Sequence, residues 1–323
     1  MKSGSNLEKV LASGKPAVTA ELGPPMSADP HEVVHKAKQL KGFCDAANIT
    51  DCQTAVVRIS SIAAAAIAFQ NGLEPVMQMT CRDRNRIAIQ ADLLGAAALG
   101  LKNCLCLAGD HQKFSAAGRL KGHPGAKNVY DLDTSQLVSM LKKMRDESKQ
   151  EGGDPIEVPP KFFIGASWTP MGDPIDIRPM NLLKKVNAGA DFIQTQGIYD
   201  MELFRAQMAK IRDLGLHERT AILAGIIVPK SAMMLKYMDS SVAGVSVPKA
   251  MIDRMSKAKA AAGEDKKKMK ELQEQEGIKI TIELIHQALE TPGVKGVHIQ
   301  AIEWESAIEG IVKAAGLYPR PSF

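Results

Sequence analysis

Three polar residues stand where buried strands are expected, and their side chains suit acid–base or hydrogen-bonding chemistry. Glu21 lies in the apolar run Val-Thr-Ala-Glu-Leu, just before two prolines. Burial raises the pKa of a carboxyl group toward the range of a general acid. Asp110 follows a glycine at the exit of a second apolar run, and Gln196 ends the run Gln-Thr-Gln. Brought together, these groups could protonate and hydrogen-bond a polar heterocycle.

Each of the three residues also has a purely structural interpretation. A neighbouring lysine or the backbone could satisfy Glu21. Asp110 could cap a helix or a turn, as aspartate often does after glycine. Gln196 could simply bond backbone groups. Only their meeting at one place would favour a binding site over these alternatives.

The elements that would bring them together alternate along the whole chain. Short β-rich apolar runs are predicted as strands at 18–22, 45–50, 75–80, 103–108, 161–167, 191–196, 221–228 and 296–301. Amphipathic stretches between them predict helices, among them 31–41, 84–99, 135–150 and 201–214. Strands that alternate with helices pair in parallel through right-handed crossovers.

Eight such units predict an α/β fold, a (β/α)8 TIM barrel formed as one domain by residues 1–323. The alternative is an open doubly wound sheet with a dinucleotide site. That fold expects the pattern G-x-G-x-x-G after its first strand, and the pattern is absent from this sequence. In a barrel the βα loops meet at one mouth, so Glu21, Asp110 and Gln196 are expected to converge there.

Two segments depart from the repeat. Residues 109–133, with glycines at 109, 118, 122 and 125, form a long loop after the fourth strand, which suggests a lid or a cofactor cover. Residues 254–277 are rich in Lys, Glu, Gln and Ala and predict an extra charged helix before the eighth strand.

Composition excludes several classes of protein. The 41 Lys and Arg against 36 Asp and Glu give a net charge of +5, too small and too dispersed for a nucleic-acid binder. Apolar runs are too short for a membrane span, and the first residues lack a hydrophobic signal region, so a cytoplasmic location is expected. Five scattered cysteines without a C-x-x-C pair predict no metal or iron–sulfur site.

Several motifs, in order along the chain, resemble the methylenetetrahydrofolate reductases of the MetF type. Ala-Glu-Leu-Gly-Pro-Pro at 20–25 is similar to the family's Glu-Phe-Phe-Pro-Pro. Leu-Ala-Gly-Asp at 107–110 is similar to its Arg-Gly-Asp. The most specific match is 181–196, where Leu-Leu-Lys-Lys, Ala-Gly-Ala and Gln-Thr-Gln follow the family pattern. Gly-Ile-Ile at 225–227 and Gly-Val-Lys-Gly-Val-His at 293–298 also fit.

The resemblance implies a flavin-containing barrel that reduces 5,10-methylenetetrahydrofolate to 5-methyltetrahydrofolate. Glu21 would be the general acid that helps to open the five-membered ring, and reduced flavin would give hydride to the methylene carbon. Asp110 would bond the pterin near the flavin and stabilise developing positive charge, and Gln196 would hold the pterin edge.

The resemblance also assigns a flavin site and favours FAD over FMN. Its positions are Thr50, Gln78, Ala108, Gly109, Asp110, Tyr130, Asp131, Asn181, Lys184 and Lys185. Four positions depart from the family pattern: Gln78 replaces a histidine, Ala108 an arginine, residues 167–169 an aromatic, and Arg178 an acid. Lys184 and Lys185 could alternatively be solvated surface residues, or could hold a phosphate or a polyglutamate tail.

Partners follow from the same resemblance. The substrate would be a tetrahydrofolate derivative, and electrons would come from NAD(P)H or from an iron–sulfur partner subunit. The positions that would face the pyridine nucleotide depart most from the family pattern, which favours a partner-dependent enzyme, as an oligomer or in a hetero-complex. Two alternatives remain: a flavin-free barrel methyltransferase that uses a pterin, and a non-catalytic structural subunit.

Overall fold

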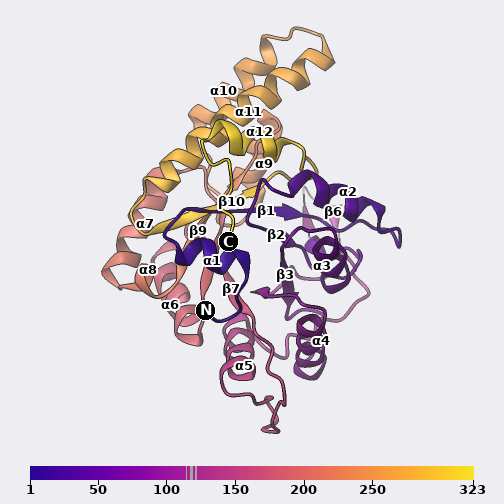
Figure 1. Ribbon diagram of the computed structural model, residues 1–323. Coiled ribbons are helices and arrows are strands. Elements are labelled where there is room, and N and C mark those ends of the chain that lie inside the picture. Colours follow the sequence, from indigo (N-terminus) through magenta and orange to yellow (C-terminus); the bar gives the residue numbers. More distant parts are fainter. Residues whose placement is uncertain (114, 117–118, 121) are drawn as a thin grey trace.

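The computed structural model describes residues 1–113, 115–116, 119–120 and 122–323, and its centre is a closed barrel of parallel strands (Figure 1). Around the barrel the order is β1, β2, β3, β4, β7, β8, β9 and β10, which pairs again with β1. The strands are β1 (Ala17–Leu22), β2 (Ala46–Ile49), β3 (Pro75–Thr80), β4 (Asn103–Leu107), β7 (Phe163–Trp168), β8 (Phe192–Gly197), β9 (Ala221–Ile227) and β10 (Val294–Gln300). Each contains or overlaps a predicted strand, so the (β/α)8 prediction is confirmed.

Helices cover the outside of the barrel. They are α1 (Asn6–Ala12), α2 (His31–Leu40), α3 (Ser61–Gln70), α4 (Arg86–Ala98), α5 (Thr134–Asp146), α6 (Arg178–Ala188), α7 (Met201–Asp213), α8 (Leu216–Arg219), α9 (Ala232–Ser241), α10 (Lys249–Ala260), α11 (Lys266–Leu289) and α12 (Ala307–Ala314). Short 3-10 helices span Gln53–Ala55 and Ile175–Ile177.

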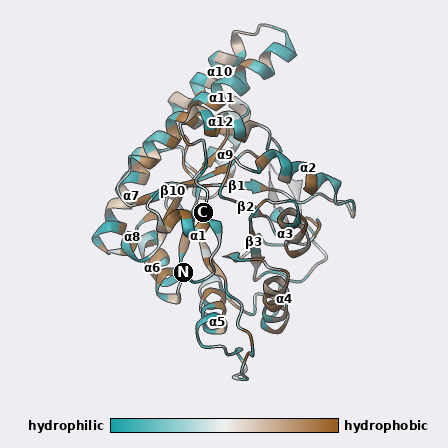
Figure 2. Ribbon diagram, in the orientation of Figure 1, coloured by the Kyte–Doolittle hydropathy of each residue, from teal (hydrophilic) through white to brown (hydrophobic). Residues whose placement is uncertain are grey.

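Helix α5 illustrates why these segments are helical. Asp133 and Gln136 form a capping box that satisfies free N–H groups at its start. The helix then buries Leu137, Leu141 and Met144, spaced three or four residues apart, against the barrel. Figure 2 shows the same division in other helices, with hydrophobic and hydrophilic residues on different sides.

The barrel interior is layered because alternate residues of each strand point inward. The layer at the amino-terminal ends of the strands, which we call the lower end of the barrel, is apolar. There Leu7 and Val10 of α1 pack together with Ala17, Ala46, Val76, Leu105, Phe163, Phe192 and Leu223. The rings of Phe163 and Phe192 stack with centroids 5.2 Å apart. A Cβ atom at Gly165 would lie 2.3 Å from the Phe192 ring, so this layer requires glycine there. This apolar layer therefore closes the barrel interior beneath the mouth.

At the same end of the barrel, three buried or partly buried carboxylates form hydrogen bonds that join neighbouring elements. Asp191 accepts from Arg145 Nη1 at 2.6 Å and from the backbone N–H of Ile164 at 2.8 Å. Asp45 accepts from Arg320 Nη2 at 2.6 Å, and Glu74 accepts from the first N–H groups of α1. Each of these acids is fully partnered.

The extra charged helix predicted before the eighth strand is confirmed, although residues 254–277 are divided between two helices. The segment is a hairpin of α10 and α11, which projects from the barrel at the top of Figure 1. The chain turns at Gly263, where φ is +62°, and Asp265 then caps α11 through the N–H groups of Lys267 and Lys268. Arg254 joins the two helices by pairing with Glu276 and Glu283.

The long loop after β4 contains a small ribbon of β5 (Ser115–Ala116) and β6 (Arg119–Leu120). Gly118 and Lys121 of the predicted lid lie outside the described residues. Within the described part, the loop packs against the segment after β2, since a Cβ atom at Gly122 would lie 3.1 Å from the Thr54 carbonyl oxygen. A role as a lid stays a prediction.

Across the part of the chain that the structure describes, none of the helices is both long and apolar enough to cross a membrane. The same residues hold no group of three or more His, Cys, Asp or Glu side chains placed to bind a metal ion. All five cysteines are free.

Candidate active site

A polar cavity of about 340 Å³ opens at the carboxyl ends of the strands. We refer to it as the central cavity. Its lining comes from β1, β2, β3, β4, β7, β8 and β10 and from the loops that follow them, as expected for the mouth of a (β/α)8 barrel. Of the predicted residues it brings together Glu21, Gln78, Ala108, Gly109, Asp110 and Gln196.

Glu21 is the unpartnered acid of this cavity. Among the described residues its side chain has no hydrogen bond and no ion pair, in contrast to the acids at the lower end of the barrel. Burial, and secondarily the nearby charge of Glu305, raise the pKa of Glu21 to about 7. Glu305 itself lies 3.2 Å from Lys36 Nζ. A carboxyl group in this state holds a proton near neutral pH and can release it to a ligand.

Asp110 is held from the loop after β2. Its Oδ2 accepts from the backbone N–H of Thr54 at 2.7 Å, and its carbonyl oxygen accepts from Arg82 at 3.1 Å. Gly109 has a φ of +88°, and a Cβ atom there would lie 3.1 Å from Thr80 Cβ and Arg82 Cβ, so only glycine suits the approach. The carboxylate is exposed and lies at the rim of the cavity.

The backbone around Asp110 is strained. Cys52, Thr54 and Ala55 have φ values of 47°, 57° and 56°, and Tyr130 has 41°. Residues other than glycine adopt this left-handed region at a cost of about 1–3 kcal/mol each, and such strain gathers at functional sites. Here it aims the Thr54 N–H at Asp110, while the Tyr130 hydroxyl donates to the Gly109 carbonyl at 3.1 Å.

Gln196 lines the central cavity from β8. Its Oε1 accepts from the backbone N–H of Gly197 at 3.0 Å. The amide nitrogen has no partner among the described residues and is available as a donor to a ligand.

Beneath these groups lies a layer of mutually bonded polar residues. Asn48 and Gln194 exchange two amide hydrogen bonds of 2.7 and 3.0 Å. His298 contacts Thr19 Oγ1 at 3.0 Å through Nδ1 and Asn48 Nδ2 at 3.4 Å through Nε2. Burial lowers the pKa of His298 to about 3, so the ring is neutral. This layer is a fixed hydrogen-bonding floor.

A basic cavity of about 280 Å³ adjoins the central cavity at Thr169, which lines both. It contains Arg178, Asn181, Lys184 and Lys185, together with Trp168 and residues 133–135. Burial, and then the charge of Arg178, lower the pKa of Lys185 to about 8. Its ammonium donates to the Ser167 carbonyl oxygen. Three cations against the one carboxylate of Asp133 leave an excess of positive charge that suits an anionic ligand such as a phosphate.

Three predicted residues lie apart from both cavities. Thr50 is buried and donates to Gln53 Oε1 at 2.8 Å. Asp131 pairs at the surface with Arg86 at 2.9 Å. Tyr130 reaches the site only through Gly109.

Sequence reasoning missed several lining residues, notably Gln53, Arg82, Gln194 and His298. Two of them carry a readable signal. Arg82 follows β3 by two residues, and His298 alternates with Gln300 on one side of β10. The position of Gln53 in the cavity depends on the conformation of the loop after β2, which no local sequence pattern indicates.

Comparison with known proteins relates this barrel to a family. The chain matches the family model described as methylenetetrahydrofolate reductase over residues 6–316. It is 26% identical over 249 residues to methylenetetrahydrofolate reductase 1 of Schizosaccharomyces pombe, covering 76% of this chain and 36% of that protein. It is 24% identical over 269 residues to a probable methylenetetrahydrofolate reductase (NADPH) of Caenorhabditis elegans, covering 81% and 35%. The chain thus spans little more than a third of the length of these relatives.

A solved structure shares the fold. It is an uncharacterized protein from Clostridium thermocellum that binds two copies of 5-methyl-5,6,7,8-tetrahydrofolic acid. The TM-score is 0.61 at 13% identity, over 96% of this chain and 99% of that one. Since the family model covers nearly the whole sequence and the barrel it implies is present, the chain belongs to the methylenetetrahydrofolate reductase family.

Proposed function

We propose that this protein reduces 5,10-methylenetetrahydrofolate to 5-methyltetrahydrofolate with electrons from a bound flavin. The observation that carries the proposal is Glu21, an acid without a partner whose pKa is raised to about 7 inside the central cavity. Asp110 and Gln196 line the same cavity. The family membership supports the substrate class.

Glu21 acts as the general acid in this proposal. Its carboxyl group protonates the ring nitrogen as the bond from that nitrogen to the methylene carbon breaks, which leaves an iminium group on the substrate. Asp110, an exposed carboxylate at the rim, stabilises the positive charge that develops there. The Gln196 amide and the polar floor of Asn48 and Gln194 bond the pterin edge and fix its orientation.

The residues present fit a flavin. Members of this family are generally flavin-dependent. The central cavity meets the basic cavity at Thr169, so a ring in the first could extend a phosphate chain toward Lys184, Lys185 and Arg178. Two lysines and an arginine match a diphosphate better than a single phosphate, which supports FAD over FMN. Once bound, reduced flavin supplies the hydride that the methylene carbon accepts.

We further propose that electrons reach the flavin from NAD(P)H or from an iron–sulfur partner subunit, and that the protein acts as an oligomer or within a hetero-complex. The departures from the family pattern at positions expected to face the pyridine nucleotide support a partner. Full turnover of the isolated protein with NADH would contradict partner dependence.

An absorption spectrum of the purified protein tests the main proposal. A flavin band is expected that bleaches on reduction with dithionite and returns when methylenetetrahydrofolate is added under anaerobic conditions. A flavin band that stays bleached would exclude this folate as the oxidant. A protein that binds no flavin after reconstitution would instead favour a pterin-dependent methyltransferase.

A further inference from the structure

A third cavity adjoins the central cavity at the segments that follow β2 and β3, and the proposed function does not use it. It measures about 340 Å³ and shares the walls formed by Asp51 and Arg82 with the central cavity. We call it the Arg58 cavity, after the residue that distinguishes it. Residues 55–58 after β2, residues 82–84 after β3, and Gln112, His123 and Ala126 of the long loop line it.

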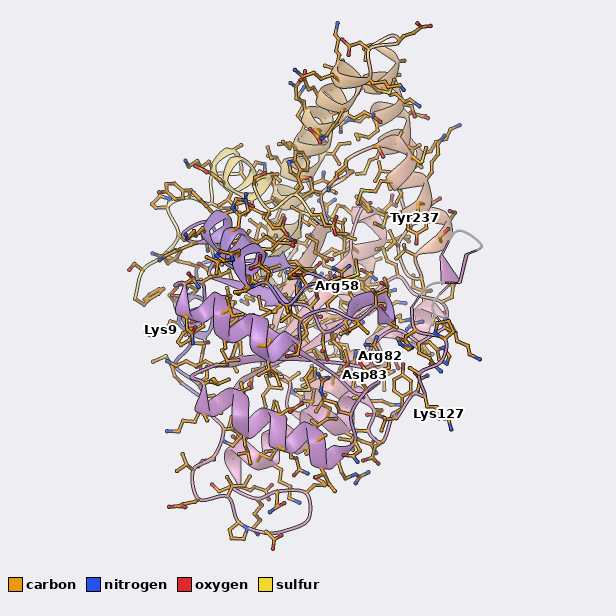
Figure 3. All side chains as sticks on the ribbon, turned by 90° about the vertical axis from the view of Figure 1, so that its right-hand side faces the viewer. Lys9, Arg58, Arg82, Asp83, Lys127 and Tyr237 are labelled. Carbon is orange, nitrogen blue, oxygen red and sulfur yellow. The ribbon has the colours of Figure 1, made fainter. Side chains whose placement is uncertain are left out.

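Most charges in the Arg58 cavity are already neutralised. Arg82 pairs with Asp83 at 2.6 Å. Arg84 pairs with Asp51 at 2.7 Å and with Asp92 at 2.9 Å. Arg82, Asp83 and Arg58 are labelled in Figure 3, where they come from neighbouring loops near the middle of the view.

Arg58 differs from these arginines. Within the described residues it has no carboxylate partner, and its one hydrogen bond runs from Nη1 to the Pro24 carbonyl at 3.0 Å. Its Nε is buried and has no partner. The edge of the guanidinium formed by Nε and Nη2 therefore has no hydrogen-bond partner among the described residues, and an edge of this kind can bind a carboxylate or a phosphate through two parallel hydrogen bonds.

The surroundings favour a bound anion over an empty cavity. Gln112 also has a buried side-chain oxygen without a partner, and its amide turned by 180° would present its NH₂ group instead. Asp83 pairs with Arg82, and Asp51 pairs with Arg84, so Arg58 is the lining arginine left without a carboxylate partner among the described residues. Buried polar groups left without partners are costly, which a ligand at this place would relieve.

The position of Arg58 connects this cavity to the proposed reaction. Arg58 also lines a smaller hollow of about 200 Å³ that includes Glu21, Glu303 and Glu305. None of these glutamates forms an ion pair with it in the described residues. A ligand protonated by Glu21 could therefore extend beyond Glu21 to the unpartnered edge of the Arg58 guanidinium.

We propose that the Arg58 cavity is an anion subsite for the ligand seated in the central cavity, which binds a carboxylate or phosphate group through Nε and Nη2 of Arg58. Resting on the proposed function, the source that the placement favours is a carboxylate of the folate glutamate tail. The other source of the same chemistry is a phosphate of the flavin.

Equilibrium binding separates these sources without requiring turnover. The probes are 5-methyltetrahydrofolate with three glutamates, with one, and its pteroate analogue with none, together with FAD and FMN. If Arg58 binds the glutamate tail, Arg58→Gln is expected to weaken binding of the glutamate forms about tenfold. The affinities for the pteroate analogue and for both flavins should then be unchanged. For a flavin phosphate, Arg58→Gln weakens a flavin and spares all the folates.

Matched variants control for folding and for general charge. Arg58→Lys keeps the charge but loses the fork, so an intermediate loss is expected. Arg205→Gln removes an exposed arginine on α7 and should change no affinity. Wild-type protein should itself bind the glutamate forms more tightly than pteroate if the tail is the source. Unchanged affinities for all five probes in Arg58→Gln, or an equal loss for pteroate and triglutamate, would overturn the subsite. A failure of the reductase proposal would appear instead in the absorption spectrum and in turnover.

Discussion

The two ends of this barrel treat buried acids in opposite ways. At the lower end Asp45 and Asp191 are each fixed by an arginine and a backbone N–H. At the mouth Glu21 has no such partner among the described residues, and its pKa is raised to about 7. The paired carboxylates hold structure, whereas the isolated one keeps its proton near neutral pH. Position in the fold therefore decides what the same functional group can do.

The largest expected effect tests the mouth. Replacing Glu21 with Gln should lower the rate of folate reduction about a thousandfold, because a positioned general acid contributes roughly 10²–10⁴. Reduction of the flavin by its donor should be unchanged, since that half-reaction does not need this proton. Stopped-flow spectra of the two half-reactions measure both rates.

The wild-type rate of folate reduction should also fall as pH rises through about 7, since Glu21 then loses its proton. In Glu21→Gln that inflection should be absent. An unchanged rate in the variant would remove Glu21 from the acid role.

The next effect tests the lower end. Arg145→Met leaves Asp191 with only Lys2 as a charged partner, so the free energy of unfolding should fall by about 3 kcal/mol. Urea unfolding measures the loss. Activity per folded molecule should stay constant, because the apolar layer closes the barrel interior beneath the mouth. The double variant with Asp191→Asn should recover part of the stability, and a loss of activity without a loss of stability would contradict the division between the two ends.

A smaller effect is expected in the basic cavity. Lys185→Met should weaken flavin binding about tenfold, since one charge-assisted contact to phosphate is lost. In the wild-type protein, flavin affinity should decline above pH 8 as the Lys185 ammonium deprotonates. Fluorescence titration from pH 6 to 10 checks both points. Lys185→Arg should bind flavin with no such decline, and the same decline in Lys185→Met would assign it to another group.

The smallest effect concerns stability at the mouth. The folded-state pKa of Glu21 lies above its unfolded value, so ionising it costs free energy as pH rises from about 4.5 to about 7. A shift of this size corresponds to about 3 kcal/mol, and solvent screening at the partly exposed Glu21 side chain reduces the effect. Glu21→Gln should therefore raise the free energy of unfolding by about 1–2 kcal/mol at pH 8 and by almost nothing at pH 4. Thermal unfolding at the two pH values measures the difference, and equal midpoint shifts at both would contradict it.

The sequence predicted the barrel because its determinants are local. Strands such as 75–80 are continuous apolar runs, and helices such as 201–214 show regular periodicity. The meeting of Glu21, Asp110 and Gln196 at one cavity followed from the rule that strand ends share a mouth.

What the sequence did not predict depends on tertiary contacts. The left-handed conformations of Cys52, Thr54 and Ala55 involve residues that carry no turn signal. Contacts with the long loop and a hydrogen bond from Arg82 to the Cys52 carbonyl oxygen hold this segment. Arg58 was not predicted because its distinguishing property is the absence of a carboxylate partner among the described residues, which a sequence does not indicate. Gly263 indicates a possible turn, but the mixture of Lys and Glu on both sides of it favoured one continuous helix.

The polar floor provides a spectroscopic reporter. Since Asn48 also donates to Gln194, the His298 Nε2 acts as an acceptor, and the ring proton sits on Nδ1 facing Thr19. A proton so shielded exchanges slowly with water and should give a resolved downfield resonance in ¹⁵N-edited NMR spectra. Because the ring does not titrate near neutral pH, any displacement of that resonance on adding folate or flavin would register occupancy of the mouth alone.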